Sequence, residues 1–63
     1  MNVITKELYV KIRNDLFEIM DELMQRSWVT TDNNDREELN KIWQILSNAE
    51  ARLYTIAYKE DND

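Results

Sequence analysis

Acidic side chains are the groups in this sequence most able to do chemistry, and five lie in its first half. They fall mainly on one side of a predicted helix, opposite its apolar residues: Glu7, Asp15, Glu18, Asp21 and Glu22. Metal sites in helical bundles use inward carboxylates and usually a Glu-x-x-His pair, whereas this chain has 0 His and 0 Cys. We therefore predict no catalytic residue, no metal, no cofactor and no enzymatic activity.

The segment TDNNDREE superficially suggests a calcium loop. Counting from Asp32, it has no Gly at the sharp turn, and Trp43 stands where such a loop needs a bidentate Glu. The three residues from Asp32 to Asn34 are good N-caps, and Asn34 has Glu37 three residues later, a variant of the capping box. The segment therefore predicts the start of a helix rather than an ion site.

Two long amphipathic helices are predicted, over residues 5–27 and 35–58. Each has apolar residues at steps of three and four, which keeps them on one side of the helix. In the first helix these are Leu8, Ile12, Leu16, Ile19 and Leu23. In the second they are Leu39, Ile42, Leu46, Ala49, Leu53 and Ile56.

Residues 28–34 form the predicted turn, because Thr, Asp and Asn side chains bond nearby backbone and compete with helix continuation. Residues 59–63 are predicted to be a frayed acidic tail. The two helices have matched lengths, so we predict one all-α domain over residues 1–63, an antiparallel two-helix hairpin.

Composition restricts how so small a domain is stabilised. A chain of 63 residues hides only ~60% of the surface that its unfolded form exposes. With 0 Cys it has no disulfide to compensate, which leaves oligomerisation or partner binding. With 0 Gly and 0 Pro it has little material for the tight turns of a sheet protein.

Charge and hydropathy indicate where the chain works. A net charge of -5 repels a phosphate backbone. Nucleic acid is therefore a disfavoured partner, although it is not excluded. No stretch approaches the ~20 apolar residues that cross a bilayer, and MNVITKELYV lacks the basic start and long apolar run of a signal peptide. We expect a soluble, unprocessed cytoplasmic protein without a membrane partner.

Each helix carries a second apolar stripe beside its Leu/Ile seam. In the first helix it consists of Val10, Phe17, Met20 and Met24, with Trp28 continuing it into the turn. In the second it consists of Trp43, Ser47, Ala51, Tyr54 and Tyr58. A helix that packs against one neighbour needs a stripe of little more than 100°, so something else must cover the rest.

Two interpretations of the second stripes stay open. They can form the core of a homodimeric four-helix bundle, or they can bind a different protein, because Met adapts to irregular partners and Tyr and Trp are enriched at hot spots. For the second we predict the contact residues Phe17, Met20, Met24, Trp43, Tyr54 and Tyr58. The predicted charged rim is Glu18, Asp21 and Glu22.

In length, acidity and hairpin layout the chain resembles the Rop family of plasmid copy-number regulators. That family dimerises into a four-helix bundle and holds RNA loops, so the resemblance implies RNA binding, for which Lys6 and Arg13 flank Phe17. The likeness is architectural, because only Ala49 is small in a seam of Leu and Ile, whereas Rop alternates small and large core residues.

Short segments resemble two other families. ITKELYV, WVTTD and AEARL, with Glu50 and Arg52, are similar to segments of the Hha/YmoA modulators of nucleoid proteins, whose closing helix has no counterpart here. REELN resembles the S-Q-E-L-D motif of the sporulation phosphorelay phosphatases, but Arg36 and Asn40 replace its Ser and its essential Asp.

The leading hypothesis from the sequence is a non-enzymatic regulatory or inhibitory protein that binds another protein. A compact acidic chain of this kind suits a phage or mobile-element product that blocks a host enzyme or nucleic-acid-binding protein. Its carboxylates would then stand in for phosphates. The alternatives are a Rop-like RNA-binding regulator and an Hha-like modulator of a nucleoid protein.

Overall fold

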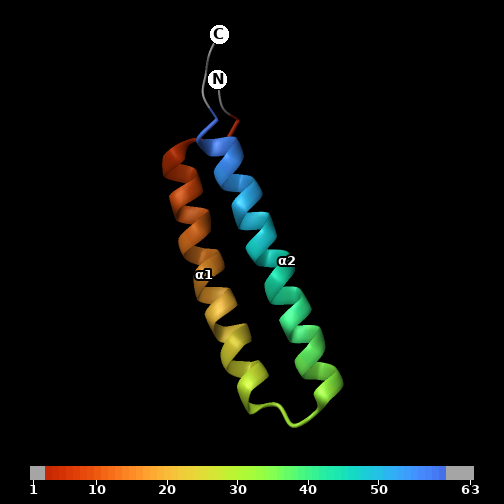
Figure 1. Cartoon of the computed structure of the whole chain (residues 1–63). Coiled ribbons are helices and arrows are strands. Elements are labelled where there is room, and N and C mark those ends of the chain that lie inside the picture. The colour runs from red at the N-terminus through yellow and green to blue at the C-terminus, as the bar shows by residue number, and fades with distance from the viewer. Residues whose placement is uncertain (1–2, 60–63) are drawn as a thin grey trace.

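The computed structural model describes residues 3–59 as two helices packed antiparallel (Figure 1). Helix α1 spans Lys6–Val29 and helix α2 spans Asn33–Ala57. The start of α1 and the end of α2 lie together at the end opposite the turn, called here the open end (Figure 1). The predicted all-α hairpin is confirmed. Of the predicted acidic tail, residues 60–63 lie outside the described part of the chain.

Side-chain caps fix where both helices begin. The Thr5 hydroxyl accepts a hydrogen bond at 3.1 Å from the backbone N–H three residues later. The Asp32 carboxylate accepts bonds from the N–H groups of Asn34 at 2.8 Å and of Asp35 at 3.3 Å. These bonds satisfy donors that a helix start leaves unpaired. The capping box predicted at Asn34 and Glu37 is wrong, because the cap is Asp32 and Asn34 already lies within α2.

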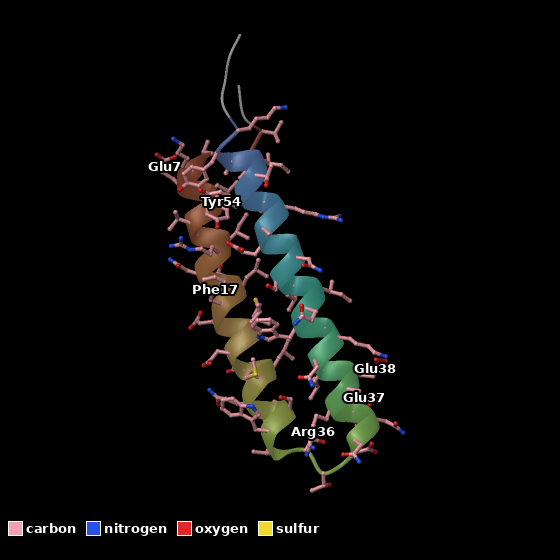
Figure 2. All side chains as sticks on the ribbon, in the orientation of Figure 1. Glu7, Phe17, Arg36, Glu37, Glu38 and Tyr54 are labelled. Carbon is pink, nitrogen blue, oxygen red and sulfur yellow. The ribbon has the colours of Figure 1, made fainter. Side chains whose placement is uncertain are left out.

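The turn is shorter than its composition predicts, since Trp28 and Val29 belong to α1. The side chain of Arg36, on α2, holds the end of α1 close to the start of α2 (Figure 2). Its Nε donates to the Ser27 carbonyl at 3.2 Å and its Nη2 to the Thr30 carbonyl at 2.7 Å. Helix ends leave carbonyls without partners, so one side chain from α2 here ties down the end of α1 and the turn.

The line of contact between the helices, called here the seam, runs between the two apolar stripes of α1. Its most buried side chains are Tyr9, Met20 and Ser27 on α1 and Ala57 on α2, and Tyr9 and Met20 are 2% and 5% exposed. The prediction that all five residues of the first stripe form the seam is wrong, because Ile19 is 51% exposed. Both stripes of each helix therefore flank the seam.

Two broad sides result, one on each flank of the seam. The aromatic side carries the exposed or half-buried residues Phe17, Met24, Trp28, Trp43, Tyr54 and Tyr58. The aliphatic side carries the exposed residues Leu8, Ile19, Ile42, Ile45 and Ile56. The surface totals 5260 Å², against ~4300 Å² for a compact monomer of this mass, because two helices side by side have no second layer.

Over residues 3–59, neither helix offers a stretch apolar enough and long enough to cross a membrane.

Candidate partner-binding surface

A groove on the aromatic side brings together predicted contact residues from both helices. Helix α1 contributes Phe17, Met20 and Met24, and α2 contributes Trp43. Three polar residues complete the lining: Asp21, Ser47 and Glu50. The groove is open to solvent and has a volume of about 440 Å³. Its residues meet because the helices are antiparallel, which sets the middle of α1 beside the middle of α2.

The predicted contact residues differ in how much surface they offer. Phe17 is 49% exposed and stands on the rim of the groove, whereas Met20 lies in the seam and forms the floor. Met24 and Trp43 are half-buried. A partner would therefore touch Phe17, Met24 and Trp43, while Met20 supports them from beneath.

Tyr54 and Tyr58 lie in a separate aromatic cluster near the open end, where Figure 2 shows Tyr54. Their rings stack with centroids 4.6 Å apart, and each meets the Tyr9 ring edge-on with centroids 5.7 Å apart. Edge-to-face and offset-stacked rings attract through their quadrupoles. The cluster joins the start of α1 to the end of α2, so both predicted contact residues also hold the hairpin closed.

The two cations on which RNA binding would depend lie over rings of this same cluster. The Lys6 ammonium is 5.2 Å from the centroid of the Tyr58 ring. The Arg13 guanidinium is 5.8 Å from the centroid of the Tyr9 ring. These cation–π contacts give both side chains a role within the hairpin, in addition to the RNA-binding role predicted for them beside Phe17.

Glu50 is a half-buried carboxylate in the wall of the groove, and Tyr9 is its partner across the seam. The Tyr9 hydroxyl donates a hydrogen bond to Oε1 of Glu50. This bond, with burial and the charge of Glu50 adding to it, raises the pKa of Tyr9 above its ordinary value, while Arg13 opposes the shift. A buried carboxylate is tolerated when it is hydrogen-bonded.

Sequence reasoning placed neither Tyr9 nor Glu50 in the contact between the helices. A signal for Tyr9 exists, because Tyr9, Leu16, Met20 and Ser27 follow seven-four-seven spacing along one line of α1. A Tyr and a Ser at its ends made that line look less apolar than the two stripes beside it.

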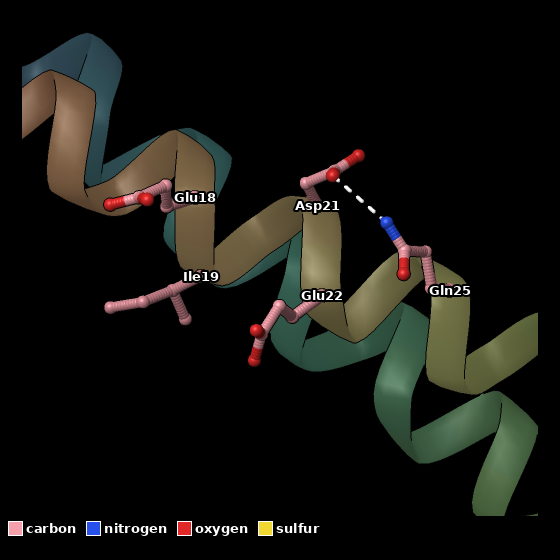
Figure 3. A pocket seen from close by; sticks show the side chains of 5 residues that line it. All are labelled: Glu18, Ile19, Asp21, Glu22 and Gln25. Atoms are coloured by element: carbon pink, nitrogen blue, oxygen red, sulfur yellow. Dashed lines mark hydrogen bonds between the residues drawn. The ribbon is translucent and has the colours of Figure 1, made fainter.

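The predicted acidic rim is divided between the groove and the outside of α1. Asp21 borders the groove and also accepts a hydrogen bond at 3.0 Å from the amide nitrogen of Gln25. Glu18 and Glu22 line a shallow depression outside α1 together with Ile19, and Asp21 borders this depression as well (Figure 3). The three carboxylates point in different directions in Figure 3. Within residues 3–59, no three acidic, His or Cys side chains are grouped to hold a metal ion.

The groove is arranged for binding an apolar side chain. Its rim and floor are aromatic and thioether groups, which accept flat or irregular apolar partners. Asp21 adds a negative charge at the edge, where it can attract a cation on the partner. No protein-family model, curated protein or solved structure matches this chain.

Proposed function

We propose that this chain is a small non-enzymatic regulatory or inhibitory protein that acts by binding another protein through its aromatic side. One observation carries the proposal: Phe17, Met24 and Trp43 from two helices share a solvent-open groove of about 440 Å³. Residues of these types concentrate binding energy at protein interfaces. A single hairpin of this size leaves them uncovered.

The charges beside the groove specify the chemistry of the partner. Asp21 lies on its edge, and Glu18 extends the negative surface around α1. The complementary surface carries an apolar or aromatic side chain next to Lys or Arg. Basic surfaces of this kind occur on nucleic-acid-binding proteins and on enzymes with anionic substrates, which suits a phage or mobile-element product that blocks such a host protein.

A homodimer is the second part of the proposal. Large apolar residues are exposed on both sides of the seam, among them Ile19 at 51% and Phe17 at 49%. One partner protein on the aromatic side would leave the aliphatic side in water. Small helical chains commonly complete their core by pairing into a four-helix bundle.

To test binding, the immobilised chain is used to capture a partner protein from the native host. The captured partner is then purified and titrated with the chain by calorimetry. Phe17→Ala removes a groove-rim ring, and we expect about 10- to 100-fold weaker binding, as for an interface hot spot. Leu8→Ala is the matched control, because Leu8 is 44% exposed but lies on the aliphatic side.

The titration also tests the charged rim, because Asp21→Asn is expected to reduce the salt dependence of binding. Equal affinity of the Phe17→Ala and Leu8→Ala variants would contradict the proposal.

A further inference from the structure

The aliphatic side is an unpartnered face that extends over both helices. Its exposed side chains, Leu8 and Ile19 on α1 and Ile42, Ile45 and Ile56 on α2, are between 39% and 64% exposed. Each broad side of two ~36 Å helices of ~10 Å diameter covers on the order of 700 Å². Stable protein interfaces take roughly 600–1,000 Å² from each partner, so this side alone is large enough for a stable contact.

At its turn end, this face carries charged side chains in a self-complementary pattern. Near the turn, Arg26 on α1 and Glu38 on α2 line opposite sides of one groove, together with Val29 and Leu39. Rotation by about 100° per residue places Glu22 and Lys41 at the outer edges of the same face, one helical turn further from the turn. At each of the two levels, α1 and α2 therefore carry opposite charges.

We propose that a second copy of this chain covers the aliphatic side, related to the first by a twofold axis parallel to the helices. In this arrangement α1 of each copy lies on α2 of the other, and both turns lie at the same end. Each residue then meets its counterpart at the same distance from the turn. Arg26 faces Glu38 of the second copy, and Glu22 faces Lys41.

The other twofold arrangement, with the axis across the helices, is disfavoured by charge. It sets α1 against α1 with opposite direction, which brings the acidic ridge of one copy onto that of the other. The ridge consists of Asp15, Glu18 and Glu22. Like charges facing across an interface oppose association.

This inference extends the homodimer of the proposed function and leaves the aromatic groove outside the dimer. Failure of the dimer and failure of target binding are therefore separate results. The exposed pair Glu38–Lys41, 3.7 Å apart within α2, does not prevent the new contacts, because an exposed ion pair contributes little.

Sedimentation equilibrium tests the face, with Ile19→Glu and Phe17→Glu as matched variants, since the two residues are 51% and 49% exposed on opposite sides. We expect the wild-type chain at twice its mass of 7.7 kDa. Ile19→Glu should be monomeric, with a dissociation constant raised about 100-fold or more, and Phe17→Glu should stay dimeric. A monomeric wild type, or dissociation by Phe17→Glu alone, overturns the proposal.

A charge swap tests the parallel-axis arrangement of the dimer. It changes exposed residues, so the hairpin itself should still fold. Glu22→Lys and Lys41→Glu should each raise the dissociation constant about fivefold at low salt, and the double variant should return to within about twofold of wild type. If the two losses add in the double variant, the parallel-axis dimer is wrong.

Discussion

The two broad sides of this hairpin differ in chemistry although one seam separates them. On the aromatic side, rings and thioethers are interleaved with polar groups that have partners, as in the Tyr9–Glu50 bond. On the aliphatic side, the exposed large side chains are Ile and Leu, and oppositely charged residues of α1 and α2 lie near the turn. Polar groups inside an apolar surface give direction and selectivity for an unlike partner. A plain aliphatic face with self-complementary charges at one end suits a second copy of the same chain.

The seam that divides the sides is itself small and partly polar. Two small residues, Ser27 and Ala57, are buried at its two ends, and the Ser27 hydroxyl donates a hydrogen bond to the Met24 carbonyl at 2.7 Å. Larger apolar residues therefore remain on the flanks, where they are available to other molecules. In so short a chain, the buried residues that stabilise the hairpin lie directly beside the exposed apolar residues that are available for binding.

Met20→Ala is expected to have the largest effect, because Met20 is 5% exposed on the seam that supports both sides. Loss of a buried Met side chain costs about 2–5 kcal/mol of unfolding free energy. Urea denaturation followed by circular dichroism measures it. Phe17→Ala, on the aromatic side only, should cost less than half as much. Equal losses would mean that the seam is not where the structure places it.

The effect of Ile42→Ala on stability should depend on protein concentration, which distinguishes the aliphatic side from the aromatic side. Ile42 is 43% exposed in the single hairpin and is covered in the proposed dimer. We expect Ile42→Ala to lower the unfolding free energy by about 1–3 kcal/mol at concentrations where the dimer forms. After dilution to monomer, the decrease should be less than half of that. For Tyr54→Ala, on the aromatic side, the loss should not change on dilution. Thermal denaturation over a range of protein concentrations separates the two.

Tyr9→Phe removes the hydrogen bond from the Tyr9 hydroxyl to Glu50 across the seam. The loss of unfolding free energy should fall between the losses for Met20→Ala and Arg36→Ala. The variant leaves the Glu50 carboxylate without the hydroxyl of Tyr9, and a half-buried acceptor that loses its donor destabilises the fold. Urea denaturation at neutral pH measures this loss. An unchanged midpoint would mean that the bond contributes nothing.

The same variant makes a pH test with a defined sign. Because the folded pKa of Tyr9 is raised above 10.0, the unfolded chain releases this proton first. The stability that Tyr9 contributes is therefore complete below about pH 10 and is lost as pH rises through the folded pKa. Denaturation midpoints of wild type and Tyr9→Phe should converge above pH 10. A constant difference between them would contradict the assignment.

Arg36→Ala is expected to have the smallest effect, about 1 kcal/mol, because its shorter bond, to the Thr30 carbonyl, is exposed and water can replace Arg36 there. Urea denaturation measures the change, with Gln44→Ala, at an exposed position of the same helix, as a control. A loss greater than about 3 kcal/mol would show that the turn controls the hairpin more than the seam does.

The helices were predictable from the sequence because their causes are local. Three-four spacing placed both helices, and the short polar side chains around Asp32 marked the start of the second. The length of the turn was not predictable, since it depends on Arg36 reaching back to Ser27 and Thr30. These bonds exist only once the helices pack.

The rotation of α1 was not predictable for a related reason. Two stripes of similar hydrophobicity compete for the same neighbour, and the choice depends on pairings between the helices, such as Tyr9 with Glu50. The groove was partly predictable, because Phe17, Met24 and Trp43 belong to the second stripes and all three line it. Met20 was grouped with them, although it lies in the seam.

Quenching of tryptophan fluorescence by acrylamide tests most directly which side meets a second copy. Trp28 and Trp43 both lie on the aromatic side, and Trp28 is 72% exposed. The account predicts equal quenching constants for the wild-type dimer and for the monomeric Ile19→Glu variant, because dimer formation covers neither ring. A lower constant in the wild-type dimer would show that the aromatic side is the dimer core, and would contradict the assignment of that side to a target protein.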